Sequence, residues 1–333
     1  MLGLVVLLGV FILLLSFFIR VRRPKNFPPG PRPWHILGNL LQLDPVNPLK
    51  DLERVKCYGN VFSIFMANYD SSWREHRRFT VTTLKNFGLG KQLKSNMGKL
   101  QSRMAWRFTI NTPCVCGRVV FQAADGDSTF NDTQMGNLIL ELVMAGTDTI
   151  SNTHRSAMLH LMTNQHVQDR CRKEIEEVLE GRTDVSFEDR HAMQYVQAVI
   201  NEVQRIGYTI PLAAFHTTCK DTQLCGYQLP KGTMVIPNLS SVLHEEGQWK
   251  FPHEFNPENF LNDKGEFVKP EAFLPFSAGI CVCLGEGLAR MELFLFVVTL
   301  LQRFQFVWPE TGGVPDLSLI FGTVCCLNPL HTL

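Results

Sequence analysis

The sequence predicts a mainly α-helical protein with small β-sheets, preceded by one N-terminal transmembrane helix. Three observations support this fold class: an apolar run over residues 2–19, helical spacing of apolar residues from Asn131 onward, and short strand-like segments confined to the carboxy-terminal half. The 333 residues are enough for one large domain or two ordinary ones, and because 45% of them are hydrophobic a sizeable core can be buried.

The charge and cysteine content exclude some classes of protein. Charged residues make up 19% of the chain and the net charge is +1, which predicts no nucleic-acid partner and no polyacidic substrate. The 10 cysteines are irregularly spaced along a long chain. This pattern favours reduced cytosolic thiols over a disulfide framework.

The apolar run over residues 2–19 predicts a membrane anchor. As a helix it reaches about 27 Å, close to the thickness of a bilayer core. Basic residues follow it at once (Arg20, Arg22, Arg23 and Lys25) and none precedes it. The positive-inside rule therefore places the rest of the chain in the cytosol. The alternative is a cleaved signal peptide, but a positive n-region, a shorter apolar run and a small-residue cleavage site are all missing.

The chain is expected to divide into three parts. Residues 1–20 form the anchor, residues 21–45 a proline-rich linker and residues 46–333 a single domain. Four prolines between Pro28 and Pro33 make the linker stiff and extended, although a generic spacer or a polyproline ligand has the same composition. Residues 98–128 show no clear periodicity and stay unassigned.

Five helices and two strands are predicted within the domain. Asp70, Ser71 and Ser72 form an N-cap for a helix that ends at Asn86. The other helices begin at Asn131, cover about 165–180 and 189–206, and run from near Cys283 to Phe304. The strands cover 223–229 and 233–236. The helix over 165–180 is expected to have a solvated face that carries Arg172, Lys173, Glu174, Glu176 and Glu177.

The chemistry is concentrated in residues 276–286, where Cys283 comes just before a helix. Free N–H groups and positive potential at a helix N-terminus lower a thiol pKa, and Gly279 permits a tight turn. A buried structural cysteine is the alternative interpretation. Phe276, Gly279, Cys283 and Gly285, however, hold the spacing of the haem-thiolate loop, and the chain here resembles the microsomal cytochrome P-450 superfamily.

The resemblance implies a haem-thiolate monooxygenase fold that binds haem b. Cys283 would be the axial ligand of the iron, while Phe276, Gly279 and Gly285 would shape the cofactor site. The family carries a basic residue two places before the cysteine, where it pairs with a haem propionate; this chain has Cys281. The absence of this basic residue is expected to weaken haem binding. It also leaves Cys281 and Cys283 open as a metal-binding or redox pair, although no further ligands stand at metal spacing.

Other motifs agree with the resemblance. Glu202 and Arg205 match the family's E-x-x-R element, which implies a buried structural ion pair; by spacing alone such a pair is more often on the surface. Residues 255–260 resemble the partner segment of this pair. Its usual Arg or His is Asn259 here, which hydrogen-bonds but carries no charge.

Residues 145–149 resemble the oxygen-activation motif of the family. By this resemblance Thr149 and Asp148 are catalytic and relay protons to dioxygen, while Gly146 leaves room for the oxygen; an ordinary polar helix segment is the alternative. Trp73 and Arg77 match W-x-x-x-R, and these residues are expected to bind haem propionates.

His216, which follows the third helix, matches a further propionate-binding position of the family. Taken alone, His216 could equally be a packed or a solvent-exposed residue with no role in haem binding. The same holds for the Trp73 and Arg77 pair taken alone.

The chain is shorter than the resemblance requires. Trp73 follows Met66 by only 7 positions and Thr149 follows Trp73 by 76, where the family has a strand pair and several helices. The distal roof over the substrate pocket is therefore expected to be largely missing, and little or no turnover is predicted.

By resemblance, the function is haem-dependent insertion of one oxygen atom into an apolar substrate, either a xenobiotic or a fatty acid. Electrons would come from an NADPH-dependent flavoprotein reductase, with cytochrome b5 as a second candidate partner. The location would be the endoplasmic reticulum membrane, with the domain on the cytosolic side. The alternative is a non-catalytic, membrane-tethered remnant.

Overall fold

The computed structural model describes Asn26 and residues 71–86, 94–95, 132–309, 313, 315–320 and 324–327. The predicted anchor over 2–19, the proline-rich motif at 27–33, Asp70 and residues 98–128 lie outside these described residues. Within the described part of the chain, no helix is both long enough and apolar enough to span a membrane.

The chain divides into two compact units. One contains Met1–Asn68 and Ala214–Pro237, and the other contains Tyr69–Ala213 and Asn238–Leu333. In the first unit, the described residues form two small antiparallel pairs: β3 (His216–Thr217) with β6 (Met234–Val235), and β4 (Thr222–Leu224) with β5 (Tyr227–Leu229). Short strands in the carboxy-terminal half were expected from the sequence.

The single strand predicted over 223–229 is wrong, because a tight turn divides it into β4 and β5. Cys225 and Gly226 form that turn with φ angles of 50° and 82°. Positive φ at both central residues is the geometry of a two-residue hairpin turn whose twist matches the flanking strands. The two halves of the predicted strand therefore pair with each other.

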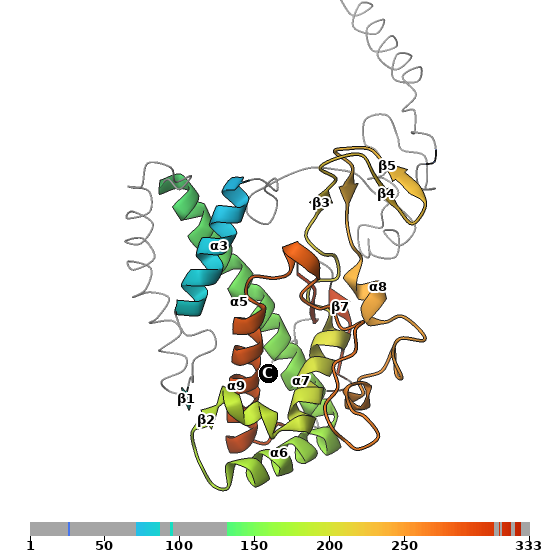
Figure 1. Cartoon of the computed structure of the whole chain (residues 1–333). Helices are drawn as coiled ribbons and strands as arrows, with labels where there is room; N and C mark the ends of the chain where they lie inside the picture. Colours follow the sequence, from blue (N-terminus) through green and yellow to red (C-terminus); the bar gives the residue numbers. More distant parts are fainter. Residues whose placement is uncertain are drawn as a thin grey trace, which may run out of the picture. The chain divides into compact units, whose positions relative to one another are not determined.

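The second unit is built from long helices. The helix α5 (Asp132–Thr163) packs with α7 (Gln194–Gly207) and α9 (Glu286–Arg303), and α6 (Gln165–Leu179) contacts all three (Figure 1). Their apolar faces meet in one core, which includes Leu161, Ile175, Val199 and Leu295. The helix α3 (Ser71–Asn86) ends at the predicted residue.

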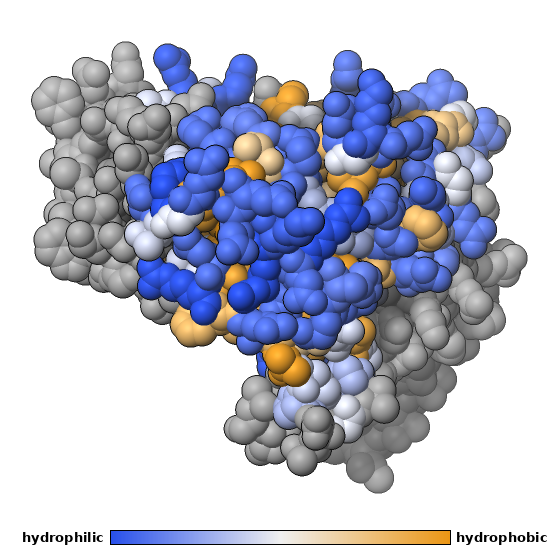
Figure 2. All heavy atoms as spheres, turned by 90° about the horizontal axis from the view of Figure 1, so that it is seen from below, coloured by the Kyte–Doolittle hydropathy of each residue, from blue (hydrophilic) through white to orange (hydrophobic). Residues whose placement is uncertain are grey.

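The helix α6 is amphipathic and lies at the surface. Figure 2, which looks from below in the view of Figure 1, shows a face that is mostly hydrophilic with small apolar spots. The solvated face predicted for α6 is wrong at Glu174. Its carboxylate accepts hydrogen bonds from the N–H groups of Tyr195 and Val196 at 2.9 and 2.8 Å, and so satisfies the first turn of α7.

The predicted start of the third helix at Asp189 is also wrong. Residues Phe187–His191 form a 3₁₀ helix, η2, and α7 begins only at Gln194. Ser186 and Asp189 make a reciprocal capping box at the start of η2. This local arrangement fixes η2 separately from α7.

Shorter elements complete the second unit: α8 (Leu239–Leu243), η3 (Pro257–Phe260) and η4 (Gly279–Cys281). The strand β1 (Lys94–Ser95) pairs with β2 (Val185–Ser186), and β7 (Leu319–Ile320) pairs with β8 (Cys326–Leu327). A second apolar cluster lies beside η3 and consists of Ala198, Leu243, Trp249, Phe260 and Phe273.

Candidate functional site

The Cys283 loop, residues 276–286, is a closed turn that leads into α9. The N–H of Cys283 donates to the Phe276 carbonyl at 3.0 Å, and the N–H of Val282 donates to the Gly279 carbonyl at 3.2 Å. Gly279 has a φ of 74°, a conformation that favours glycine, and so takes the predicted turn. The helix begins at Glu286, three residues later than predicted, with Gly285 as its N-cap.

The Cys283 thiol keeps accessible surface although protein atoms surround much of it. The resulting loss of hydration raises the pKa of Cys283 above its ordinary value. Backbone N–H groups of Gly285 and Glu286 and the charge of Arg77 oppose this rise, while the Glu286 carboxylate adds to it. The N–H donors expected at a helix start are present, but their lowering of the thiol pKa is smaller than the rise that desolvation causes.

Arg77 connects α3 to the Cys283 loop. Its Nη2 donates to the Val282 carbonyl at 2.8 Å, across 205 positions of sequence. The guanidinium carbon lies 5.3 Å from the centroid of the Trp73 ring, and Trp73 is buried. The structure therefore brings the predicted pair, Trp73 and Arg77, together with the loop that carries Cys283.

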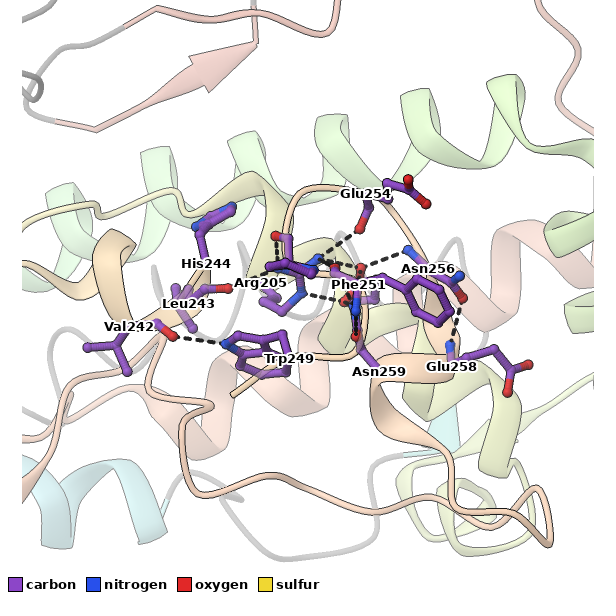
Figure 3. A network of polar contacts seen from close by, with 12 residues as sticks. Arg205, Val242, Leu243, His244, Trp249, Phe251, Glu254, Asn256, Glu258 and Asn259 are labelled. Atoms are coloured by element: carbon purple, nitrogen blue, oxygen red, sulfur yellow. Dashed lines mark hydrogen bonds and ion pairs between the residues drawn. The ribbon is translucent and has the colours of Figure 1, made fainter. Parts of the chain in front are cut away.

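The Glu202–Arg205 pair is buried on α7, as the E-x-x-R resemblance implies. Both side chains have an exposed fraction of 0%, and Arg205 donates from Nε to Glu202 Oε2 at 2.7 Å and from Nη2 to Oε1 at 2.8 Å. The remaining guanidinium hydrogens reach four backbone carbonyls (Figure 3), those of Leu243, Pro252, Phe251 and Glu254. This geometry uses the whole guanidinium to fix the chain segment that follows α8.

Asn259 completes this network without adding a charge. Its Nδ2 lies 3.2 and 3.3 Å from the two carboxylate oxygens of Glu202, and its Oδ1 accepts from the N–H of Phe251 at 2.9 Å (Figure 3). The loss of the family's basic residue at this position therefore leaves no gap in the hydrogen bonding.

Residues 145–149, which resemble the oxygen-activation motif of the family, lie within α5. The hydroxyl of Thr149 donates to the Ala145 carbonyl at 2.5 Å, and Asp148 is exposed. A Cβ at Gly146 would meet nothing within 4 Å, so there is open space beside the helix. The neighbouring Val143 and Met144 are also exposed, at 45% and 63%.

His216 belongs to β3 in the other compact unit, where its Nδ1 lies 2.7 Å from the Ala214 carbonyl. Its predicted contact with a propionate, like the roles of Thr149 and Asp148, stays a prediction.

Sequence reasoning missed the residue that braces this loop, Arg290. It forms an ion pair with Glu286 one turn earlier on α9, with Nε and Nη2 both 2.9 Å from Oε1. The i,i+4 spacing of a Glu and an Arg after Cys283 is the signal that identifies it.

The residues of the Cys283 loop fit a haem group. An accessible sulfur that accepts two backbone hydrogen bonds is a suitable iron ligand, and a nearby guanidinium suits propionate carboxylates. Gly285 leaves the space next to the sulfur free, since even a Cβ there would lie 3.9 Å from Sγ. Cys281 is exposed at the end of η4 and offers no positive charge. Among the described residues, no group of three or more potential ligands forms a metal site of another kind.

Comparison with known proteins identifies the family of this chain. The family model "Cytochrome P450" matches residues 114–325, a range that includes α5, α7 and the Cys283 loop. Human "Cytochrome P450 2D6" is 30% identical over 481 aligned positions, which cover 98% of this chain and 97% of the relative. Rat "Cytochrome P450 2D4" is 29% identical, with 96% and 95% covered, and mouse "Cytochrome P450 2D9" is 30% identical, with 96% and 94% covered.

The alignments also measure how short the chain is. The 481 aligned positions exceed the 333 residues of this chain by 148, so at least that many positions face a gap in this chain. Coverage of the relatives from end to end and the match of the family model nevertheless lead to one conclusion. The chain belongs to the cytochrome P450 family, whose members are oxidoreductases of the monooxygenase type that bind haem iron through a cysteine thiolate.

Proposed function

We propose that this chain binds haem b through Cys283 and supports monooxygenation of apolar organic compounds, either xenobiotics or fatty acids. The observation that carries the proposal is the Cys283 thiol itself. It is accessible, accepts hydrogen bonds from the N–H groups of Gly285 and Glu286, and lies in a loop that Arg77 binds at Val282. Family membership supports the same chemistry.

When bound, the haem supplies an iron that activates dioxygen with two electrons, which the side chains alone cannot do. The protein residues hold and protect it. Arg77 and Trp73 on α3 would bind propionate carboxylates through charge-assisted hydrogen bonds. His216 is proposed as a further propionate-binding residue. Thr149 and Asp148 on α5 would carry protons to dioxygen, and the open space beside Gly146 would leave room for it. Glu202 and Arg205 support the fold as a buried ion pair that holds the chain segment after α8.

We also propose where the chain lies in the cell and which proteins supply its electrons. Residues 1–20 anchor the chain in the endoplasmic reticulum membrane, residues 21–45 form a linker, and residues 46–333 form the domain on the cytosolic side. An NADPH-dependent flavoprotein reductase supplies the electrons, and cytochrome b5 is a second electron donor. These assignments rest on the sequence pattern and on the family, whose named members include human "Cytochrome P450 2D6".

A reduced carbon monoxide difference spectrum of the purified full chain tests the haem ligand. A thiolate-type band is expected for the wild type and for Cys281→Ser, and its loss is expected for Cys283→Ser. Thiolate character that survives in Cys283→Ser but disappears in Cys281→Ser would show that the wrong cysteine has been assigned.

A second candidate function is haem or partner binding without turnover. The aligned gaps of at least 148 positions and the exposed Val143 and Met144 on α5 favour it, because these side chains belong to the helix that carries Thr149. The family's distal roof, which would be largely missing here, closes the substrate pocket against water.

Turnover of a panel of apolar substrates, with reductase and NADPH supplied and peroxide monitored, distinguishes the two candidates. Little product and a high yield of peroxide indicate the second candidate. Product formation that is well coupled to NADPH consumption indicates a closed pocket and the first candidate.

A further inference from the structure

Arg290 contacts both ends of the Cys283 loop from its position on α9. At the carboxyl end, its Nε donates to Glu286 Oε1 at 2.9 Å. At the amino end, its guanidinium carbon lies 5.1 Å from the centroid of the Phe276 ring, within cation–π range. The Phe276 carbonyl in turn accepts the N–H of Cys283 at 3.0 Å. Arg290 therefore holds both of the residues that fix the backbone around the thiol.

Arg290 is itself fixed to α7 through Asn201. Its Nη1 donates to Asn201 Oδ1 at 3.2 Å, and Asn201 Nδ2 donates to the Gln197 carbonyl at 2.7 Å. Asn201 is buried and directly precedes Glu202, the carboxylate of the buried pair. Arg290 is therefore tied to the buried segment of α7 that carries the Glu202–Arg205 pair.

Arg290 also balances a charge next to the thiol. The N–H of Glu286 donates to the Cys283 carbonyl at 3.4 Å, and the Glu286 carboxylate disfavours negative charge on the sulfur. The ion pair with Arg290 neutralises that carboxylate, and it is partly shielded from water, with side-chain exposures of 26% for Arg290 and 30% for Glu286. Because Cys281 supplies no cation of its own, this neutralisation matters more here than in a loop with a basic residue at that position.

We propose that Arg290 is a positioning residue for the Cys283 ligand, which it serves by clamping Phe276 and Glu286 and by neutralising the carboxylate beside the sulfur. The electrostatic part rests on the proposed ligation of haem by Cys283. The mechanical part is a property of the chain's own contacts and is tested without haem.

Amide hydrogen exchange of the full chain tests the clamp. In Arg290→Gln, amide exchange in residues 276–286 is expected to accelerate about tenfold. The reason is that the variant loses local interactions worth about 1.4 kcal/mol, which corresponds to a factor of about ten. Asn201→Ala removes only the anchor and is expected to give a smaller acceleration in the same segment. The matched control is Lys173→Gln, which breaks the exposed i,i+4 pair with Glu177 on α6 and should leave the loop unchanged.

The proposal that Arg290 clamps the loop is overturned if amide exchange in the loop is unchanged. It is also overturned if exchange accelerates equally over the whole of the second unit. If Arg290→Gln does not fold, Asn201→Ala carries the same test, because it removes two hydrogen bonds, those with Arg290 and with the Gln197 carbonyl, and no charge. Loop exchange in Asn201→Ala that matches the Lys173→Gln control then counts against the proposal.

The reduction potential of the haem-loaded chain tests the electrostatic part. Arg290→Gln leaves the Glu286 charge unbalanced and should shift the potential to more negative values, whereas Glu286→Gln should shift it to more positive values. The double variant should return close to wild type, and Arg290→Lys should keep the potential while its loop exchange rises. Shifts of the same sign in both single variants indicate a merely structural role for Arg290 and overturn the electrostatic part of the proposal. Persistence of a thiolate spectrum in Cys283→Ser instead contradicts the proposed function, and the exchange result still stands.

Discussion

The amide of Asn259 faces the carboxylate of Glu202, with its Nδ2 at 3.2 and 3.3 Å from the two oxygens. A neutral amide here replaces the basic residue that the family uses. Because the Glu202 carboxylate already has the full guanidinium of Arg205 as its counter-charge, a second cation is unnecessary for balance. The amide instead satisfies the remaining lone pairs of the carboxylate, as a buried ion pair requires.

Asn259→Ala is expected to lower the free energy of unfolding by about 1–3 kcal/mol, because it leaves the N–H of Phe251 and part of the Glu202 carboxylate without partners in a buried site. Urea unfolding of the purified chain measures the change. The control is Gln248→Ala, which removes an amide from an exposed position in the same segment. Equal effects of the two substitutions would mean that the Asn259 contacts contribute nothing to stability.

Glu292 on α9 makes stability depend on pH. Burial raises its pKa from the ordinary 4.5 to about 7, so the folded chain keeps this proton to higher pH than the unfolded chain does. The contribution of Glu292 is therefore fully present below pH 4.5 and is lost as pH rises through about 7. At about 1.4 kcal/mol per pKa unit, the whole loss is at most about 3 kcal/mol.

Glu292→Gln should remove this loss. The variant is expected to gain stability over wild type between pH 5 and pH 8, while the exposed control Glu176→Gln on α6 should keep the wild-type dependence. Unfolding free energies measured over that interval decide the matter. A wild-type and a Glu292→Gln curve that stay parallel would show that Glu292 does not titrate as stated.

Much of the helical framework follows from local pattern. The end of α3 at Asn86, the start of α6 at Gln165 and the length of α6 agree with the spacing of apolar residues in the sequence. The division of the strand over 223–229 was also readable, since Cys225-Gly226 is a turn signal within it.

The contacts that were missed join residues far apart in sequence. Glu174 has the expected charge for a solvated face, but it caps α7 through N–H groups 21 and 22 positions later. Arg290 meets Asn201 across 89 positions. No local pattern contains such partners, because tertiary packing decides which of several polar residues on a helix turns inward. The site was predicted through a motif, while its support depends on these long-range contacts.

Alanine substitutions at the two glycines of the Cys283 loop are predicted to have different effects on stability. Gly279 has a φ of 74°, so Gly279→Ala is strained by about 1–2 kcal/mol and should lower both thermal stability and the haem-to-protein ratio. Gly285 has a φ of −88°, and a Cβ there would make only ordinary contact with Sγ at 3.9 Å. Gly285→Ala should therefore leave the stability of the haem-free chain unchanged.

If Gly285 serves the close approach of the cofactor, Gly285→Ala should still reduce haem retention. Thermal unfolding before and after haem loading separates the two effects. Loss of stability of the haem-free chain in Gly285→Ala would show that the chain itself needs this glycine. Full haem retention in the variant would remove Gly285 from the cofactor site.

Cys281→Arg is expected to improve haem retention. Cys281 ends η4 two positions before Cys283 and is exposed, so a longer side chain fits without displacing the core. An arginine there supplies the charge-assisted hydrogen bond to a propionate that the family obtains from its basic residue, worth about 1–3 kcal/mol. That energy corresponds to haem dissociation slowed by about fivefold to a hundredfold.

The measurement for Cys281→Arg is the haem-to-protein ratio after gel filtration, together with the rate of haem transfer to an excess of an acceptor apoprotein. Cys219→Arg is the matched control, because it introduces the same charge at another exposed cysteine, one outside the loop. A gain confined to Cys281→Arg supports a propionate beside η4. Equal gains in both variants would trace the effect to net charge, and no gain in either would show that the loop does not present position 281 to the cofactor.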